Sequence, residues 1–141
     1  MMSIKEKVKR ICDSEFPNWS YVYEDWYGAD AVVERVPLPA IIAIMPTTGA
    51  VEERNGRIYD REELALAFVD KVPKGANGED NAIVYERMKN AAAMWVKSAN
   101  ASGYFEPISG EVKFEVIYEE LTSVVTGVFV ELSLKDKIGR C

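Results

Sequence analysis

Residues 79–100 read EDNAIVYERMKNAAAMWVKSAN, and this stretch decides how the rest of the chain can fold. Its apolar side chains recur at spacings of three and four residues, which places them along one side of an α-helix. Acidic residues at its start suit the positive end of a helix dipole. The stripe consists of Val84, Met88, Ala91, Ala92, Trp95 and Ala99. We therefore predict one long amphipathic helix whose apolar side packs in the core.

Two strands are predicted after this helix, beyond a connection that contains glycine, serine and proline. Residues 112–120 and 125–134 largely alternate apolar and polar side chains, which is the pattern of strands with one buried face. Residues 121–124 join the two strands as a β-hairpin. Residues 135–141 are polar, and we expect them to form a loose tail.

A second hairpin and a loop are predicted before the long helix. Asn55–Gly56 lies between two charged, strand-like segments, and this dipeptide favours the positive φ angles of a tight hairpin turn. Residues 64–69 alternate and predict a strand, whereas residues 47–49 (Thr-Thr-Gly) indicate a turn. Residues 73–80 contain proline, glycine and asparagine and predict a mobile loop.

The N-terminal third predicts a helix followed by strands. Residues 3–16 open with the pattern of a capping box and continue with an apolar stripe. Residues 19–23 carry alternating aromatic side chains, and residues 31–36 predict a further strand. Residues 38–45 are almost wholly apolar, so we expect a strand that is covered on both faces.

These elements predict a single α+β domain over residues 1–141. The fold is expected to be a mainly antiparallel sheet, packed by the N-terminal helix and the long central helix and closed by a C-terminal β-hairpin. Both helices are placed on one face of the sheet, which leaves the other face for solvent or a partner. A chain of 141 residues is close to the modal size of one domain.

Composition narrows the possible partners and compartments. The formal net charge of −6 disfavours nonspecific binding to nucleic acid, which needs clustered lysine and arginine. The N-terminus lacks the apolar segment of a signal peptide, and the longest apolar run, residues 38–45, is too short to span a bilayer. The two cysteines, Cys12 and Cys141, lack the spacing of a metal site or a disulfide framework. We expect a cytoplasmic protein with neither a membrane nor a specific nucleic acid as partner.

The sequence contains no histidine, which removes the usual routes to catalysis. Histidine is the only side chain whose unperturbed pKa lies between pH 5 and 8, and catalytic triads and common zinc enzymes depend on it. The phosphate-binding patterns GxxxxGK[ST] and GxGxxG are also absent. The acidic pairs Glu79–Asp80 and Glu119–Glu120 fit a helix start and a strand end. We therefore predict a protein that is not an enzyme, without catalytic, metal or cofactor-binding residues.

The closing strand pair reads FEVIY at residues 114–118 and TGVFVEL at residues 126–132. It is similar to the C-terminal strand pair of phage tail-terminator and minor tail-completion proteins, and the predicted order of elements resembles that family along most of the chain. The resemblance implies a structural protein that forms a ring, typically hexameric, which caps the growing tail tube. It also implies assembly in the host cytoplasm, a final place in the virion tail, and other tail or head-connector proteins as partners.

Surface features give candidate contact residues that are independent of this resemblance. The aromatic group near the first strand is larger than the edge of a small core needs, and tryptophan and tyrosine are enriched at interface hot spots. The predicted hairpin and loop also protrude. The candidate interface residues are Trp19, Tyr21, Tyr23, Trp26, Tyr27, Asn55, Gly56, Lys74 and Asn77. Burial in the core and in cross-strand pairs is the other interpretation of the aromatic residues.

Two further functions stay open on the sequence. One is a small-molecule-binding or enzymatic cone-shaped α+β domain, in which Tyr21, Tyr23 and Trp95 line a pocket and Glu24 or Asp25 acts as a base. The other is an adaptor domain that binds a partner protein along an exposed sheet edge.

Overall fold

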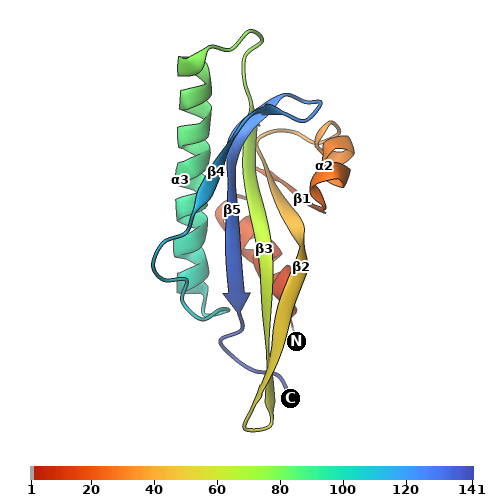
Figure 1. Ribbon diagram of the computed structural model, residues 1–141, viewed down its shortest axis with the longest axis vertical. Helices are drawn as coiled ribbons and strands as arrows, with labels where there is room; N and C mark the ends of the chain where they lie inside the picture. Colours follow the sequence, from red (N-terminus) through yellow and green to blue (C-terminus); the bar gives the residue numbers. More distant parts are fainter. Residues whose placement is uncertain (1) are drawn as a thin grey trace.

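Across residues 2–141, which the computed structural model describes, five strands form one sheet in the order β1-β2-β3-β5-β4 (Figure 1). Along the chain the elements are α1 (Ile4–Glu15), β1 (Ser20–Glu24), α2 (Trp26–Val33), β2 (Ala40–Arg54), β3 (Arg57–Lys71), α3 (Gly78–Ser102), β4 (Phe114–Glu120) and β5 (Val125–Lys135). β1 pairs with β2 in parallel, and the other neighbours pair antiparallel. The predicted α+β class, with a mainly antiparallel sheet and a C-terminal strand pair, is confirmed.

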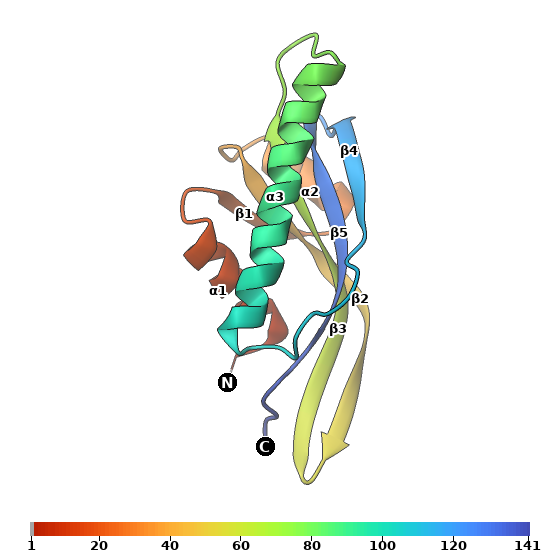
Figure 2. The same cartoon turned by 90° about the vertical axis from the view of Figure 1, so that its left-hand side faces the viewer.

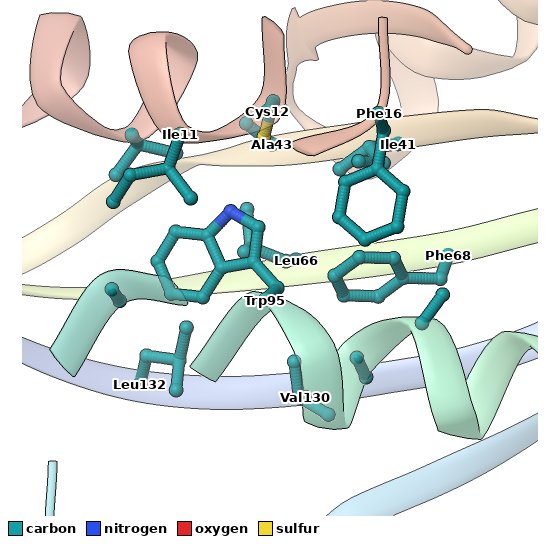
Figure 3. Packing of buried hydrophobic residues seen from close by; sticks show 14 of the residues in the cluster. Ile11, Cys12, Phe16, Ile41, Ala43, Leu66, Phe68, Trp95, Val130 and Leu132 are labelled. Carbon is teal, nitrogen blue, oxygen red and sulfur yellow. The ribbon is translucent and has the colours of Figure 1, made fainter. Parts of the chain in front are cut away.

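The larger core lies between the sheet and the two helices α1 and α3. The predicted apolar stripe of α3 is buried there, and Trp95 and Met88 are completely inaccessible to solvent. Figure 3 shows the indole of Trp95 close to Ile11 and Cys12 of α1. Burial of one large apolar side chain contributes about 1.5–3 kcal/mol, so this stripe is what holds α3 on the sheet. Asn77 and Asp80 form a capping box that begins the helix, and Gly103 ends it in the left-handed conformation.

A second, smaller core lies on the opposite face of the sheet, beneath α2 (Figure 1). The prediction of a strand at residues 31–36, and of helices on one face alone, is therefore wrong. Asp25 begins α2 by accepting a hydrogen bond from the backbone N–H of Gly28, and Ala29 and Val33 lie one turn apart against the sheet. Periodicity cannot separate helix from strand in an apolar run this short, and tertiary burial decides between them.

The turn predicted at residues 47–49 is also wrong, because β2 continues through it. The chain absorbs the irregularity as a shift of register against β3 between Ile44 and Thr48. Gly49 makes the close approach of the two strands possible, since a Cβ atom there would lie 2.4 Å from the carbonyl oxygen of Arg61. β2 and β3 consequently form one long hairpin of 15 residues in each strand.

The C-terminal tail, predicted to be loose, lies along the β2–β3 hairpin. Ile58 and Arg140 exchange two backbone hydrogen bonds of 2.8 Å, and the guanidinium of Arg140 contacts Asp60 at 2.9 Å. Asp136 accepts a hydrogen bond from the backbone N–H of Asp60 and pairs with Lys7 of α1 at 2.7 Å. The tail therefore joins the hairpin to the first helix.

The ion pair between Lys7 and Asp136 is nearly inaccessible to solvent, with side-chain exposures of 11% and 9%. Asp136→Asn keeps an acceptor for the Asp60 N–H but leaves the ammonium of Lys7 buried without a counter-charge. We expect the free energy of unfolding to fall by about 3 kcal/mol in urea denaturation. Asp13→Asn is the matched control, because it breaks the exposed Lys9–Asp13 pair of the same helix and should cost less than about 0.5 kcal/mol. Equal losses in both variants would contradict this assignment.

Candidate protein-protein interface

We call the outer part of the β2–β3 hairpin, residues 46–62, the arm. It extends past the helices (Figure 2), and from Asp60 to the turn β3 also runs past the end of its pairing with β5. β1 pairs with β2 only as far as Ile44. In the described part of the chain, no strand covers the outer side of β2 after that residue. The backbone N–H and C=O groups along the outer edge of the arm are therefore open to another chain.

The tip of the arm follows the predicted Asn-Gly turn. Asn55 and Gly56 adopt φ angles of 52° and 79°, and Arg54 pairs directly with Arg57. Two consecutive positive φ angles are typical of a type I′ turn, whose twist matches the flanking strands. The predicted hairpin is thus confirmed, with both candidate residues exposed at the end farthest from the core.

Polar contacts stiffen the arm. The ammonium of Lys135 donates a 3.0 Å hydrogen bond to Glu52, and this contact lowers the pKa of the Glu52 carboxyl from its ordinary value. The guanidinium of Arg54 contacts Glu52 at 2.6 Å and lies over the ring of Tyr59, 4.1 Å from its centroid. These contacts, together with the C-terminal tail that pairs with Ile58, hold the two strands of the arm in place.

The arm also exposes apolar surface at its outer edge. The side chain of Val51 is 70% exposed, and it lies between Ala50 and the charged segment Glu52–Arg54. Sequence reasoning selected the turn Asn55–Gly56 and missed this edge. In the sequence this edge is marked only by Val51, a β-branched residue next to charged ones. The same pattern occurs in an ordinary strand that faces solvent.

The opposite edge of the sheet is formed by β4, for which the described part of the chain supplies one strand partner, β5. Phe114 and Tyr118 are 44% and 53% exposed on this strand. An apolar groove of about 350 Å³ runs between the start of β4 and α3. Its lining includes Val112, Phe114, Ala93, Val96 and Lys89.

Hydrogen bonds fix the far end of β4. The hydroxyl of Thr126 donates to Asn81 at 2.6 Å, and Asn81 donates to Glu119 at 3.2 Å and to the carbonyl of Asn77 at 3.1 Å. From the other side, Asp30 of α2 accepts two hydrogen bonds from Thr122. The edge strand is therefore held between α2 and α3.

The structure divides the aromatic candidates between different environments. Trp19, Tyr21 and Tyr23 are partly buried against the larger core, and Lys5 and Lys9 lie over the two tyrosine rings. Trp26 packs edge-on against Phe129 on the other face, with ring centroids 6.1 Å apart. Tyr27 alone among these five is freely exposed, at 89%. The aromatic group thus lies in two separate places.

The two candidates of the 73–80 loop have different positions. Lys74 is exposed beside the turn that precedes α3, whereas the side chain of Asn77 is used to cap that helix. Asn77 is therefore explained by the start of α3, and its role in an interface stays a prediction.

The residues predicted to line a ligand pocket do not form one large cavity together. Tyr21 and Tyr23 border a hollow of about 10 Å³, and Trp95 does not line it. The indole Nε1–H of Trp95 and the hydroxyl of Tyr21 are buried and have no hydrogen-bond partner among residues 2–141. The sulfur of Cys12 lies beside the indole (Figure 3), and burial raises the pKa of this thiol to about 12. Asp25 caps α2 instead of facing this hollow.

A broad hollow of about 720 Å³ lies elsewhere, between the strands at the base of the arm and the 107–112 segment. Glu63, Glu111 and Glu131 contribute carboxylates to its lining, next to apolar groups such as Ile44 and Phe129. Within residues 2–141, no group of three or more acidic or cysteine side chains is placed to hold a metal ion.

The chain matches no protein-family model, and no curated protein matches it. None of the helices in residues 2–141 combines the length and the apolar character that crossing a membrane requires.

Glu62 lies at the base of the arm in the hollow next to Tyr23. Burial, and then the negative charges of Asp60 and Asp136, raise the pKa of its carboxyl above the ordinary value. The folded state therefore binds this proton more tightly than the unfolded state, and stability is lost as the pH rises from the ordinary to the raised value.

We therefore expect Glu62→Gln to raise the free energy of unfolding at pH 7. The gain should stay below about 1 kcal/mol because solvent screens this group, and it should vanish near about pH 4. Urea denaturation at both pH values measures the difference. Glu63→Gln is the control on the opposite face of β3, where it removes contacts with Arg61 and Ser133 and should destabilise the protein. A gain that is larger at acidic pH would contradict the assignment.

Proposed function

We propose that this protein is a self-associating structural component of a phage or prophage tail, which forms a ring that completes the tail tube at the head-tail junction. The observation that carries the proposal is the arm, a stiffened hairpin with an unpaired outer edge and an exposed valine. Such an edge favours pairing with another chain, and natural proteins usually cover or shorten edges that have no partner.

The two open edges of the sheet favour a closed ring over a simple dimer. The outer edge of the arm and the outer edge of β4 belong to different strands and carry different side chains. A contact between unlike surfaces is head-to-tail, so an open chain of copies keeps one free surface at each of its two ends until the assembly closes. The fold thus offers the type of contact from which a ring is built.

The order of elements supports the placement in a tail. An N-terminal helix, strands with a projecting hairpin, a long helix and a closing strand pair follow the order of phage tail-terminator proteins, as the sequence suggested. On that basis the partners are further copies of the chain, in a hexameric ring, and neighbouring tail or head-connector proteins. The site of action is the host cytoplasm during assembly and the virion tail afterwards.

An adaptor that binds a different protein would use the same open edges. The oligomeric state separates the two functions, since an adaptor needs no copies of itself. We therefore expect the purified wild-type protein to associate with rising concentration into one closed species of about six copies, following the family resemblance. Light scattering and native mass spectrometry measure this, and a strict monomer at high concentration would contradict the proposal.

Val51→Lys should weaken this association, because a charge on the arm opposes the burial of its edge. Ile83→Lys is the matched control, since Ile83 is an exposed apolar residue of α3 with a similar exposure of 65%. The two variants should have similar thermal unfolding midpoints. Unchanged assembly of Val51→Lys would show that the arm is not the contact.

Deletion of the gene from an inducible prophage tests the place in the tail. A missing terminator leaves the tube without a stop and without a surface for the head, so we expect tails of uncontrolled length without attached heads. Electron microscopy of induced lysates measures both features, and complementation with the wild-type gene is the control. Normal, headed tails in the deletion strain would exclude this role.

A further inference from the structure

We infer that the arm of one copy pairs with the segment Glu111–Phe114 of the next copy, antiparallel and in one register, with Val51 opposite Phe114. The inference rests on the proposed self-association and names the surfaces that would carry it. The occupant of the groove beside β4 is thus a second copy of this chain.

The two segments cannot meet inside one chain. The arm edge belongs to β2 and the other segment leads into β4, and β3 and β5 lie between these strands in the sheet. Figure 1 shows the arm at one end of the molecule and β4 on the opposite side of the sheet, next to α3. Their pairing therefore joins two copies, and because the surfaces differ, the contact is head-to-tail.

Three of the four cross-strand pairs in this register are favourable, and the fourth sets Glu53 opposite Val112. With Val51 opposite Phe114, Glu52 lies opposite Lys113, and Arg54 lies opposite Glu111. Opposite charges and apolar-aromatic contacts directly across a strand pair are both favourable. A shift by one residue would place Glu52 opposite Phe114 and bring Glu53 opposite Lys113, which loses the apolar pair.

The charges already lie on matching faces in each segment. Arg54 contacts Glu52 at 2.6 Å on one face of the arm, and Lys113 contacts Glu111 at 3.9 Å on one face of the other segment. Lys113 and Glu111 are 88% and 77% exposed. Glu52 also contacts Lys135 at 3.0 Å and Arg54 also contacts Glu106 at 3.8 Å within the chain, so pairing would add a further opposite charge to each. Lys113 and Glu111 would gain a second partner without being buried, so the desolvation cost stays small.

The remaining face of the arm fits the groove. Residues i and i+2 of a strand point to the same side, so Val51 and Glu53 lie together and away from Glu52 and Arg54. In the paired copy this side faces the groove lined by Val112, Phe114 and the α3 side chains. Val51, 70% exposed in the isolated chain, would there be covered by apolar groups.

Charge reversal tests this register. Arg54→Glu alone would place two negative charges opposite each other, at positions 54 and 111. Glu111→Arg alone would place two positive charges at the same two positions. Each single variant should raise the concentration for half-assembly at least tenfold, because like charges across an interface are strongly unfavourable. The double variant, with both charges exchanged, should assemble again near the wild-type concentration. Arg10→Glu, an exposed arginine of α1, is the control that should leave assembly unchanged.

Cysteine cross-linking fixes the geometry. In a Cys141→Ser background, Val51→Cys combined with Phe114→Cys places two thiols opposite each other, within reach of a disulfide. Oxidation should give a ladder beyond the dimer on a non-reducing gel. Val51→Cys combined with Tyr118→Cys is the control. Tyr118 lies four residues beyond Phe114 along β4, so this pair should give little cross-linked product.

The outcomes separate this inference from the proposed function. Assembly of the wild-type protein without this cross-link, or without rescue in the double variant, overturns the register and leaves self-association standing. Cross-linking that stops at the dimer overturns the head-to-tail contact. A wild-type protein that stays monomeric overturns both. Thermal unfolding midpoints within a few degrees of wild type show that the variants remain folded.

Discussion

The antiparallel pairing of β3 with β5 is the constraint on which the rest of the structure depends. It runs without interruption from Arg61 opposite Lys135 to Lys71 opposite Val125. Near the Lys71–Val125 end, a Cβ atom on Gly127 would lie 1.8 Å from the carbonyl oxygen of Phe68, so the two strands approach this closely only because the residue is glycine. The same register sets one row of β3 side chains against α1 and α3 and the other row against α2. It also sets where β3 leaves the body and becomes the arm.

Much of the fold was predictable because its signals are periodic and long. The helix that contains Val84 to Ala99 has one apolar side that can be buried. The Asn55–Gly56 turn has only a few conformations available. The errors fall on short segments. Residues 26–33 are too few for a period to be recognised, and the bulge before Thr48 depends on a partner strand that is distant in the sequence.

The candidate site was less predictable, since an open sheet edge is a property of pairing and not of residue type. Nothing in Val51 or Phe114 shows that β1 stops at Ile44 or that β4 is the last strand. The aromatic residues had the clearer signal, and most of it is explained by burial against two separate cores. Tyr27 alone among them has the exposure that a contact residue needs before binding.

An open edge carries a risk of uncontrolled aggregation, and the arm limits that risk through its own sequence. Pro46 lacks a backbone donor, and the bulge and the charged run Glu52–Arg54 disfavour flat pairing with an arbitrary strand. The same charges favour a partner that offers the opposite pattern in the same order. Glu111 and Lys113 offer that pattern beside an apolar groove, so the features that reject other strands would select a second copy of this chain. A ring needs this selectivity, because the two end copies of the open assembly each keep one edge exposed until the last contact closes.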